Sequence, residues 1–356
     1  MKISWQGWAA IILILAFIYA TKGILLPFVA GLAVAYLLDP MADKLEEFKF
    51  PRWLAATTIL SVFFIGLFAL FVMVSPIVQG QVTGIIKNFP SYIAVAKPML
   101  DGFLINLSDG FGIDVAKDTE GLMSVAADEA LQKAGTMIKA FLSGSVAFFS
   151  LISLLLISPV VAFFLLRDWD LLIDKLDQWV PKDESKTIRV LATKIDAALA
   201  GFVRGQTLVS LSMAILYAIG WSIVGLDYAL ILGIIAGIMA YVPFVGALFA
   251  ALIAILVGFG QFGADALSIF HIFLVFVVVQ IIEAGFLTPR LIGTRVGLHP
   301  VWVLFAIFAG GEVMGFVGVL IAVPAAAAIG VLVRYVIDRY LESDLHKGEG
   351  GENPNK

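Results

Sequence analysis

The sequence predicts an all-α polytopic membrane protein that combines full spans with broken or re-entrant helical hairpins and a helical extramembrane insertion. Hydrophobic residues make up 61% of the 356 residues and charged residues only 14%, whereas soluble domains average about 25% charged residues. A soluble fold of this length would need a charged exterior, and too few charged residues are present to form one. The excess apolar surface is therefore expected to face lipid.

Four segments are long enough to be full spans. A transmembrane helix needs roughly 20 mostly apolar residues, because it must cross about 30 Å of hydrocarbon with its backbone groups paired internally. This criterion selects residues 53–79, 141–166, 206–225 and 265–287. A further apolar stretch near the N-terminus, 8–20, lacks a signal-peptide cleavage pattern and is expected to be retained.

Three other apolar segments, 5–38, 228–259 and 300–333, are interrupted. The expected breaks lie at Thr21-Lys22-Gly23 and Pro27, at Pro243 and Gly246, and at Gly310-Gly311-Glu312 and Gly315. The motif Pro-Phe-Val occurs at both Pro27 and Pro243. Paired interruptions of this kind are typical of transporters built from repeats. An internal repeat and a chance coincidence in an apolar chain both remain open.

The arginines orient the chain in the membrane. If 5–38 and 300–333 are hairpins that each enter and leave on one face, and 228–259 is a hairpin that does so from the opposite face, all eight arginines lie on one side, together with both termini. The positive-inside rule makes that side cytoplasmic. If 228–259 and 300–333 were single spans instead, Arg290 and Arg295 would lie outside, so the hairpin interpretation is favoured.

Two regions are expected outside the membrane. Residues 80–140 carry twelve charged residues, and Pro90 and Pro98 are expected to break the region into short helices. Residues 167–205 contain apolar residues at helical spacing, which predicts amphipathic helices on the cytoplasmic side. The predicted organisation is an N-terminal hairpin and first span (1–79), an extracytoplasmic helical insertion (80–140), a span (141–166), cytoplasmic amphipathic helices (167–205), a membrane core with broken helices (206–340) and a disordered tail (341–356).

The composition excludes several function classes. The chain has no cysteine, its three histidines are widely scattered, and no basic run resembles a nucleic-acid patch. It also lacks a phosphate-binding loop, a nucleophile elbow and a metalloprotease histidine pair. The sequence therefore predicts neither an enzyme nor a cofactor, and any pumping would draw on an ion gradient or on the gradient of the substrate itself.

Gln280 and Glu283 are the first candidate site residues. They are three residues apart near the end of an apolar segment, so they share one helix face. A carboxylate inside a span is costly unless it is used or paired. Glu283 is thus a candidate site for a proton or a cation, with ion pairing to Arg290 or Arg295 as the structural alternative.

The interruptions supply the other candidates for a substrate or ion pathway. A broken helix at membrane depth is tolerated where it is buried or lines a cavity. Glu312 and the breaks at Pro243, Gly246, Gly311 and Gly315 could therefore contact substrate, although a hairpin tip at the headgroups and simple helix packing explain them too. Candidate gating residues are Arg204 and Arg290, and the positive-inside rule alone would also account for Arg204.

Together these residues resemble the autoinducer-2 exporter family of permease-like bacterial membrane proteins. The resemblance spans nearly the whole chain and is weakest over 80–140. Its motifs are Pro27-Phe28, 35–40 (Ala-Tyr-Leu-Leu-Asp-Pro), 163–168 (Phe-Phe-Leu-Leu-Arg-Asp), Pro181, Arg204-Gly205-Gln206, 241–246 (Tyr-Val-Pro-Phe-Val-Gly), Gln280, Glu283, Pro289-Arg290, 297–300 (Gly-Leu-His-Pro), Gly310-Gly311, Gly315, Gly318 and Pro324. The chain departs from the family at Ala284-Gly285-Phe286, where relatives often carry a small polar residue.

The resemblance implies a transporter in the bacterial inner membrane, with oligomers occurring in the family. Some relatives resemble exporters of autoinducer-2, a small polar quorum-sensing molecule, and others resemble sodium or lithium/proton antiporters. Export of a small polar molecule is therefore the favoured function, in a homo-oligomer. A monovalent-cation antiporter using Glu283, and a non-transporting scaffold for envelope assembly that docks through 80–140, are the alternatives.

Overall fold

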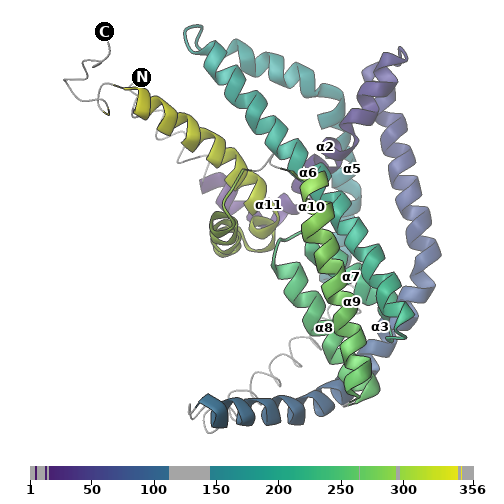
Figure 1. Cartoon of the computed structure of the whole chain (residues 1–356). Helices are drawn as coiled ribbons and strands as arrows, with labels where there is room; N and C mark the ends of the chain where they lie inside the picture. Colours follow the sequence, from purple (N-terminus) through teal and green to yellow (C-terminus); the bar gives the residue numbers. More distant parts are fainter. Residues whose placement is uncertain are drawn as a thin grey trace. The chain divides into compact units, whose positions relative to one another are not determined.

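The computed structural model describes residues 16–111, 145–263, 265–293 and 297–343, together with Trp5, Leu13 and His346. Within these ranges the chain is helical and forms no strand, which confirms the predicted all-α fold class (Figure 1). The predicted insertion is described only up to residue 111, and most of the predicted tail, 341–356, lies outside the described residues. The elements are η1 (Lys22–Ile24), α2 (Leu25–Glu47), α3 (Arg52–Phe111), α5 (Ser145–Gln178), α6 (Ser185–Ile223), α7 (Ala229–Ala240), α8 (Val245–Phe262), α9 (Ala266–Ile282), the π-helix η2 (Glu283–Leu287), α10 (Thr288–Leu291) and α11 (Pro300–Glu342).

The helices expose a large area of apolar side chains, and exposing this area to water would be unfavourable. On α3, for example, Val62 is 68% exposed, Phe68 66% and Met73 78%. Six helical segments of the described chain are long and apolar enough to cross a membrane: Lys22–Glu47, Arg52–Ile85, Ser185–Ile223, Val245–Phe262, Ala266–Leu291 and Pro300–Glu342. A lipid environment satisfies both observations, because it solvates apolar side chains and requires the backbone to be paired within helices.

The chain divides into two compact units. Unit 1 contains residues 1–60, 157–206 and 289–356, and unit 2 contains 61–156 and 207–288. Helices α3, α5 and α6 contribute residues to both units. Within the described residues, each unit contains a helical hairpin whose backbone is broken at its tip.

The hairpin of unit 2 is formed by α7 and α8, which pack against each other. The break lies between Ala240 and Val245, where Phe244 adopts a positive φ of 66°. Pro243 has no backbone N–H to continue a helix, which explains the position of the break. A Cβ on Gly246 would collide with the backbone of Ala240, so glycine permits the tight return of the chain.

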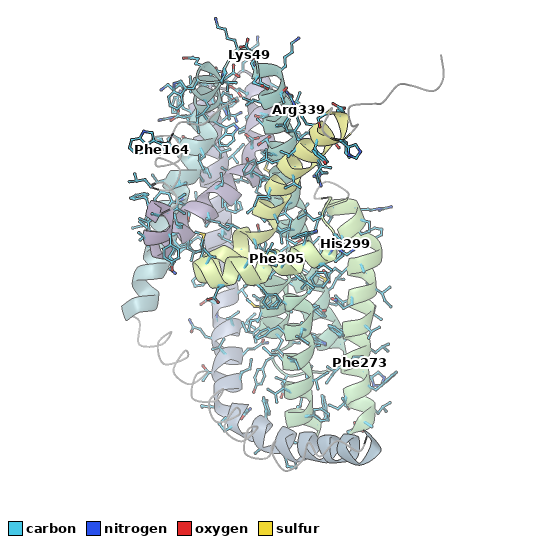
Figure 2. All side chains as sticks on the ribbon, turned by 90° about the vertical axis from the view of Figure 1, so that its left-hand side faces the viewer. Lys49, Phe164, Phe273, His299, Phe305 and Arg339 are labelled. Carbon is cyan, nitrogen blue, oxygen red and sulfur yellow. The ribbon has the colours of Figure 1, made fainter. Side chains whose placement is uncertain are left out.

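The hairpin of unit 1 is formed by α11, whose two arms meet at Gly315. This residue has φ 62° and ψ −140°, a conformation that only glycine adopts readily. Gly310 on the first arm lies against Gly318 on the second. Figure 2 shows Phe305 on the first arm and Arg339 near the end of the second.

Breaks within helices occur at fewer positions than the sequence suggests. Gly310, Gly311 and Glu312 stay helical, and only Gly315 departs from helical geometry in α11. Pro27 lies in the first turn of α2, where a missing N–H costs nothing, so the N-terminal interruption is confined to Thr21 and η1. Pro90 and Pro98 likewise lie inside α3, which continues to Phe111, because one lost hydrogen bond bends a helix more often than it ends one.

Small residues allow close helix packing in unit 2. Gly233 and Gly237 of α7 lie against Ala218 and Ala214 of α6, and added Cβ atoms there would clash. Such contacts drive helix association in lipid, where no hydrophobic effect does. The largest fully buried side chains of α6 are Trp221 and Tyr217.

Helix α9 begins with a carboxylate cap that should respond to pH. Asp265 accepts hydrogen bonds from the Ser268 amide (3.2 Å), the Ser268 hydroxyl (2.5 Å) and the Leu267 amide (3.4 Å). The bonds from Ser268 lower the pKa of Asp265 below its usual range. The cap is therefore complete above the usual pKa of aspartate, about 3.9, and is lost as the pH falls through the lowered value.

Replacing Asp265 by asparagine should remove this pH dependence, because asparagine caps a helix without titrating. After correction for intrinsic rates, hydrogen exchange at Leu267 and Ser268 is expected to accelerate on acidification in the wild type. In Asp265→Asn it should stay constant. Equal acid sensitivity in both proteins would contradict the carboxylate cap.

Candidate functional site

The polar residues of unit 2 meet where α6 faces the end of α9. The Tyr217 hydroxyl of α6 donates a hydrogen bond to Oε1 of Gln280 at 3.1 Å. Tyr217 is fully buried, while Gln280 and Glu283 are half-buried. Glu283 follows Gln280 by three residues and begins the next element, η2. The structure thus places both predicted residues beside a third polar group that the sequence analysis did not select.

Two aromatic side chains pack on the ring of Tyr217. The Tyr217 ring stacks on Trp221 with centroids 4.6 Å apart, and on Phe276 of α9 at 6.4 Å. Trp221 is only 1% exposed. Its indole nitrogen has no hydrogen-bond partner among the described residues, and neither does the buried hydroxyl oxygen of Ser210. These two atoms lie on the Tyr217 face of α6, since residues 210, 217 and 221 are spaced by seven and four.

Buried polar atoms without partners are rare in native proteins, and water, an ion or a ligand usually explains them. In a membrane protein the cost of leaving them unpaired is larger still, because no bulk water is close. The face of α6 that carries Ser210, Tyr217 and Trp221 can therefore bind polar atoms that come from outside the protein.

Glu283 opens a single π-helical turn, η2, at the end of α9. Insertions of this kind are frequent at functional sites, because they widen the helix and reorient side chains. A Cβ on Gly285, inside this turn, would meet no atom within 4 Å. The turn was not predicted from the sequence, which has no proline between Asp265 and Thr288 to mark a change in the helix.

The remaining pathway candidates divide between the units. Pro243 and Gly246 belong to the α7–α8 turn of unit 2, whereas Gly311, Glu312 and Gly315 belong to the α11 hairpin of unit 1. Glu312 is exposed. Its neighbour Val313 accepts a weak hydrogen bond, at 3.4 Å, from the Lys22 ammonium beside η1. The N-terminal interruption and the α11 hairpin, far apart in sequence, are therefore neighbours in unit 1.

Arg204, a candidate gating residue, belongs to a charged network in unit 1. Its Nε donates to the Tyr36 carbonyl at 2.6 Å, and its Nη2 lies 3.4 Å from Asp39. Asp39 also pairs with Arg52 at 2.8 Å. Asp39 was selected from the sequence only as part of the 35–40 motif. The helical spacing of Asp39, Asp43 and Glu46, all of which bind Arg52, is the signal that could have identified it.

The other gating candidate, Arg290, is an exposed residue of α10 in unit 1. Arg295, the alternative partner of Glu283, lies outside the described residues. No metal-binding group of three or more His, Asp or Glu side chains occurs in the part of the chain that the structure describes.

Comparison with known proteins gives matches along almost the whole chain. Residues 8–338 match the family described as "AI-2E family transporter". The chain is 30% identical to "Putative transport protein YueF" of Bacillus subtilis, over 85% of this chain and 80% of that protein. It is 27% identical to "Putative transport protein YrrI" of the same organism, with coverages of 88% and 86%. With "Putative permease PerM" of Escherichia coli the identity is 26%, and the coverages are 89% and 88%.

Proposed function

The chain belongs to the AI-2E family of transporters and is a multi-pass membrane protein, and from this premise we propose that it is a secondary transporter that exports a small polar molecule such as autoinducer-2. Tyr217, Gln280 and Glu283 would bind the solute or the coupling ion. The observation that carries the proposal is the hydrogen bond from Tyr217 of α6 to Gln280 of α9, three residues before Glu283. The Trp221 indole nitrogen on the same face of α6 has no hydrogen-bond partner among the described residues.

The polar atoms of this face fit a hydroxylated solute. A solute oxygen can accept from the Trp221 indole, and a solute hydroxyl can donate to Gln280 or Glu283. The aromatic rings of Tyr217 and Phe276 would cover its apolar side. The hairpin turns are further proposed contacts, through Pro243 and Gly246 in unit 2 and through Gly311, Glu312 and Gly315 in unit 1.

Glu283 also supports a second candidate, a sodium or lithium/proton antiporter. A carboxylate inside an apolar helix can exchange a proton for a monovalent cation, and such residues mark ion pathways in membrane proteins. We place the protein in the bacterial inner membrane with both termini cytoplasmic, as a homo-oligomer, with Arg204 and Arg290 as gating residues.

Proton flux in proteoliposomes, followed with an internal pH dye, tests the proposal. Sodium, lithium and autoinducer-2 are added separately to wild type, Glu283→Gln and Glu342→Gln, the last being a matched loss of a carboxylate at the exposed end of α11. Flux evoked only by autoinducer-2, and reduced at least tenfold in Glu283→Gln, is the expected result.

Other outcomes separate the alternatives. Flux evoked by sodium or lithium and lost in Glu283→Gln would identify an antiporter. Equal loss in Glu342→Gln would show a general effect of removing charge and would contradict a specific role of Glu283. Absence of any flux, combined with absence of autoinducer-2 transport in a direct uptake assay, would overturn the transporter assignment in favour of a scaffold.

A further inference from the structure

Unit 1 contains a charged groove that shares no residue with the Tyr217, Gln280 and Glu283 cluster, although Arg204, a proposed gating residue, lines its larger cavity. Two adjoining cavities of about 750 Å³ and 430 Å³ lie between the first half of α6 and the second arm of α11. Lys194, Val331 and Arg334 line both cavities, so the two form one continuous groove. The larger cavity is also lined by α2 and α5 residues, including Tyr36 and Trp169, whose rings meet edge to face at 5.9 Å.

The carboxylates of the larger cavity are already occupied. Asp39 pairs with Arg52 and Arg204, and Asp43 pairs with Arg52. Asp196 accepts a hydrogen bond from the Tyr36 hydroxyl at 2.9 Å. The carboxylates of this cavity therefore already have partners within the protein, whereas Lys194 and Arg334, which also line it, form no ion pair among the described residues.

In the smaller cavity, cationic side chains outnumber carboxylates. Its walls carry Lys186, Lys194 and Arg334 against one carboxylate, Asp338. Among the described residues, no carboxylate forms an ion pair with any of the three cations. A fourth cation, Arg339, donates to the hydroxyl of Tyr335 on the same wall at 3.1 Å.

Lys186 and Lys194, which have no carboxylate partner among the described residues, differ in this respect from Arg189 on the same helix. Arg189 lies between Lys186 and Lys194 in sequence, but Asp177 binds it with two hydrogen bonds of 2.8 and 2.7 Å. The cations that face the cavity are thus the ones that have no carboxylate partner among the described residues, and Arg334 donates one hydrogen bond, to the Gly297 carbonyl at 3.0 Å. An anion from outside the protein would form ion pairs with these cations, and the hydroxyls of Thr187 and Tyr335 could donate further hydrogen bonds to it.

Apolar side chains accompany these cations. Val190, Leu191 and Val331 line the smaller cavity. The same arm of α11 carries exposed apolar residues next to Arg334, including Leu332 and Val336. A free inorganic anion gains nothing from such a surface, whereas a phospholipid places its phosphate among cations and its acyl chains on apolar side chains.

We propose that this basic groove of α6 and α11 binds the phosphate headgroup of an anionic phospholipid. Lys186, Lys194 and Arg334 hold the phosphate, and the acyl chains lie along the apolar surface of α11. The bound lipid joins the amphipathic half of α6 to the end of α11, which are distant in sequence. This site is independent of the transport cluster in unit 2, because none of its residues belongs to that unit.

Native mass spectrometry of the detergent-solubilised full chain tests the proposal. Phosphatidylglycerol, phosphatidylcholine and inorganic phosphate are titrated separately into wild type, Lys186→Gln/Lys194→Gln and Lys175→Gln/Lys182→Gln. The control lysines are exposed, do not line the groove and change the net charge equally. The wild type and the control should bind phosphatidylglycerol at least tenfold more tightly than phosphatidylcholine, and the groove variant should lose this preference.

Several results would overturn the proposal. They are unchanged phosphatidylglycerol binding in the groove variant, equal binding of phosphatidylcholine by the wild type, and competition by inorganic phosphate at concentrations similar to those of the lipid, which would identify a free-phosphate site. Lys186→Arg/Lys194→Arg retains the charge and should retain the lipid. If the glutamine variant does not fold, loss of lipid selectivity from wild type in 0.5 M salt becomes the deciding measurement, since a charge-dependent site must weaken there.

Discussion

Gly318→Ala is expected to destabilise the α11 hairpin by about 2–3 kcal/mol, which would make it one of the most damaging single-methyl additions in the chain. A Cβ at this position would overlap the carbonyl group of Gly310 and approach Cβ of Met314 to 2.9 Å. Backbone atoms of the opposite arm cannot rotate away as a side chain can, so the two arms must separate. Chemical unfolding in mixed micelles measures the loss of stability.

Gly311→Ala is the matched control, one residue along from Gly310 on the first arm. A Cβ there meets only a methyl group of Val319, at 3.2 Å. Because alanine also favours the helix by about 1 kcal/mol over glycine, we expect the stability of this variant to be close to that of the wild type. Similar destabilisation by both substitutions would mean that the arms are not packed at Gly310 and Gly318.

The contrast between these glycines shows which part of the fold could be predicted from the sequence. Pro243 and Gly315 impose local constraints, a missing N–H and a conformation reserved for glycine, and the chain breaks at both. Gly310 and Gly311 allow a break without requiring one. Both stay helical, and Gly310 lies against Gly318 of the second arm. A contact between two arms cannot be read from local sequence.

Of the candidate-site residues, only Gln280 and Glu283 could be predicted from the sequence. Glu283 and Gln280 are conspicuous in an apolar segment, because polar groups there are costly. Tyr217 and Trp221 are not, since aromatic residues four apart in an apolar helix usually indicate packing. The Tyr217 hydroxyl donates a hydrogen bond to Gln280, which is 63 residues away along the chain. The packing of α6 on α9 brings the two residues together.

The domain boundaries drawn from hydropathy remain predictions. Hydropathy locates apolar residues along the chain, whereas the compact units depend on which helices contact each other. Helices α3, α5 and α6 each pass from one unit to the other without a break. A continuous helix carries no sequence signal at the point where its contacts change, so the division into units could not be inferred from the sequence.

Arg52 is the centre of the charged network in unit 1, and its loss is also expected to lower the stability of the protein strongly. Its guanidinium donates to the Leu166 carbonyl at 2.8 Å and binds Asp39, Asp43 and Glu46. Its side chain is only 14% exposed. Arg52→Gln would leave three carboxylates close together with little compensation, which is expected to cost about 2–3 kcal/mol of unfolding free energy.

Two further variants separate a network from a single ion pair. Arg52→Lys keeps the charge but cannot reach four acceptors from one ammonium group, so it should restore only part of the stability. Arg189→Gln removes an exposed arginine with two hydrogen bonds to one carboxylate, Asp177, and should change the unfolding midpoint little, because exposed ion pairs are screened by solvent. If Arg52→Gln unfolded at the same midpoint as Arg189→Gln, the stabilising contribution of the network would be refuted. A large effect at Arg52 alone would show that this arginine, which follows three regularly spaced carboxylates, fastens the end of α2 to α3 and α5.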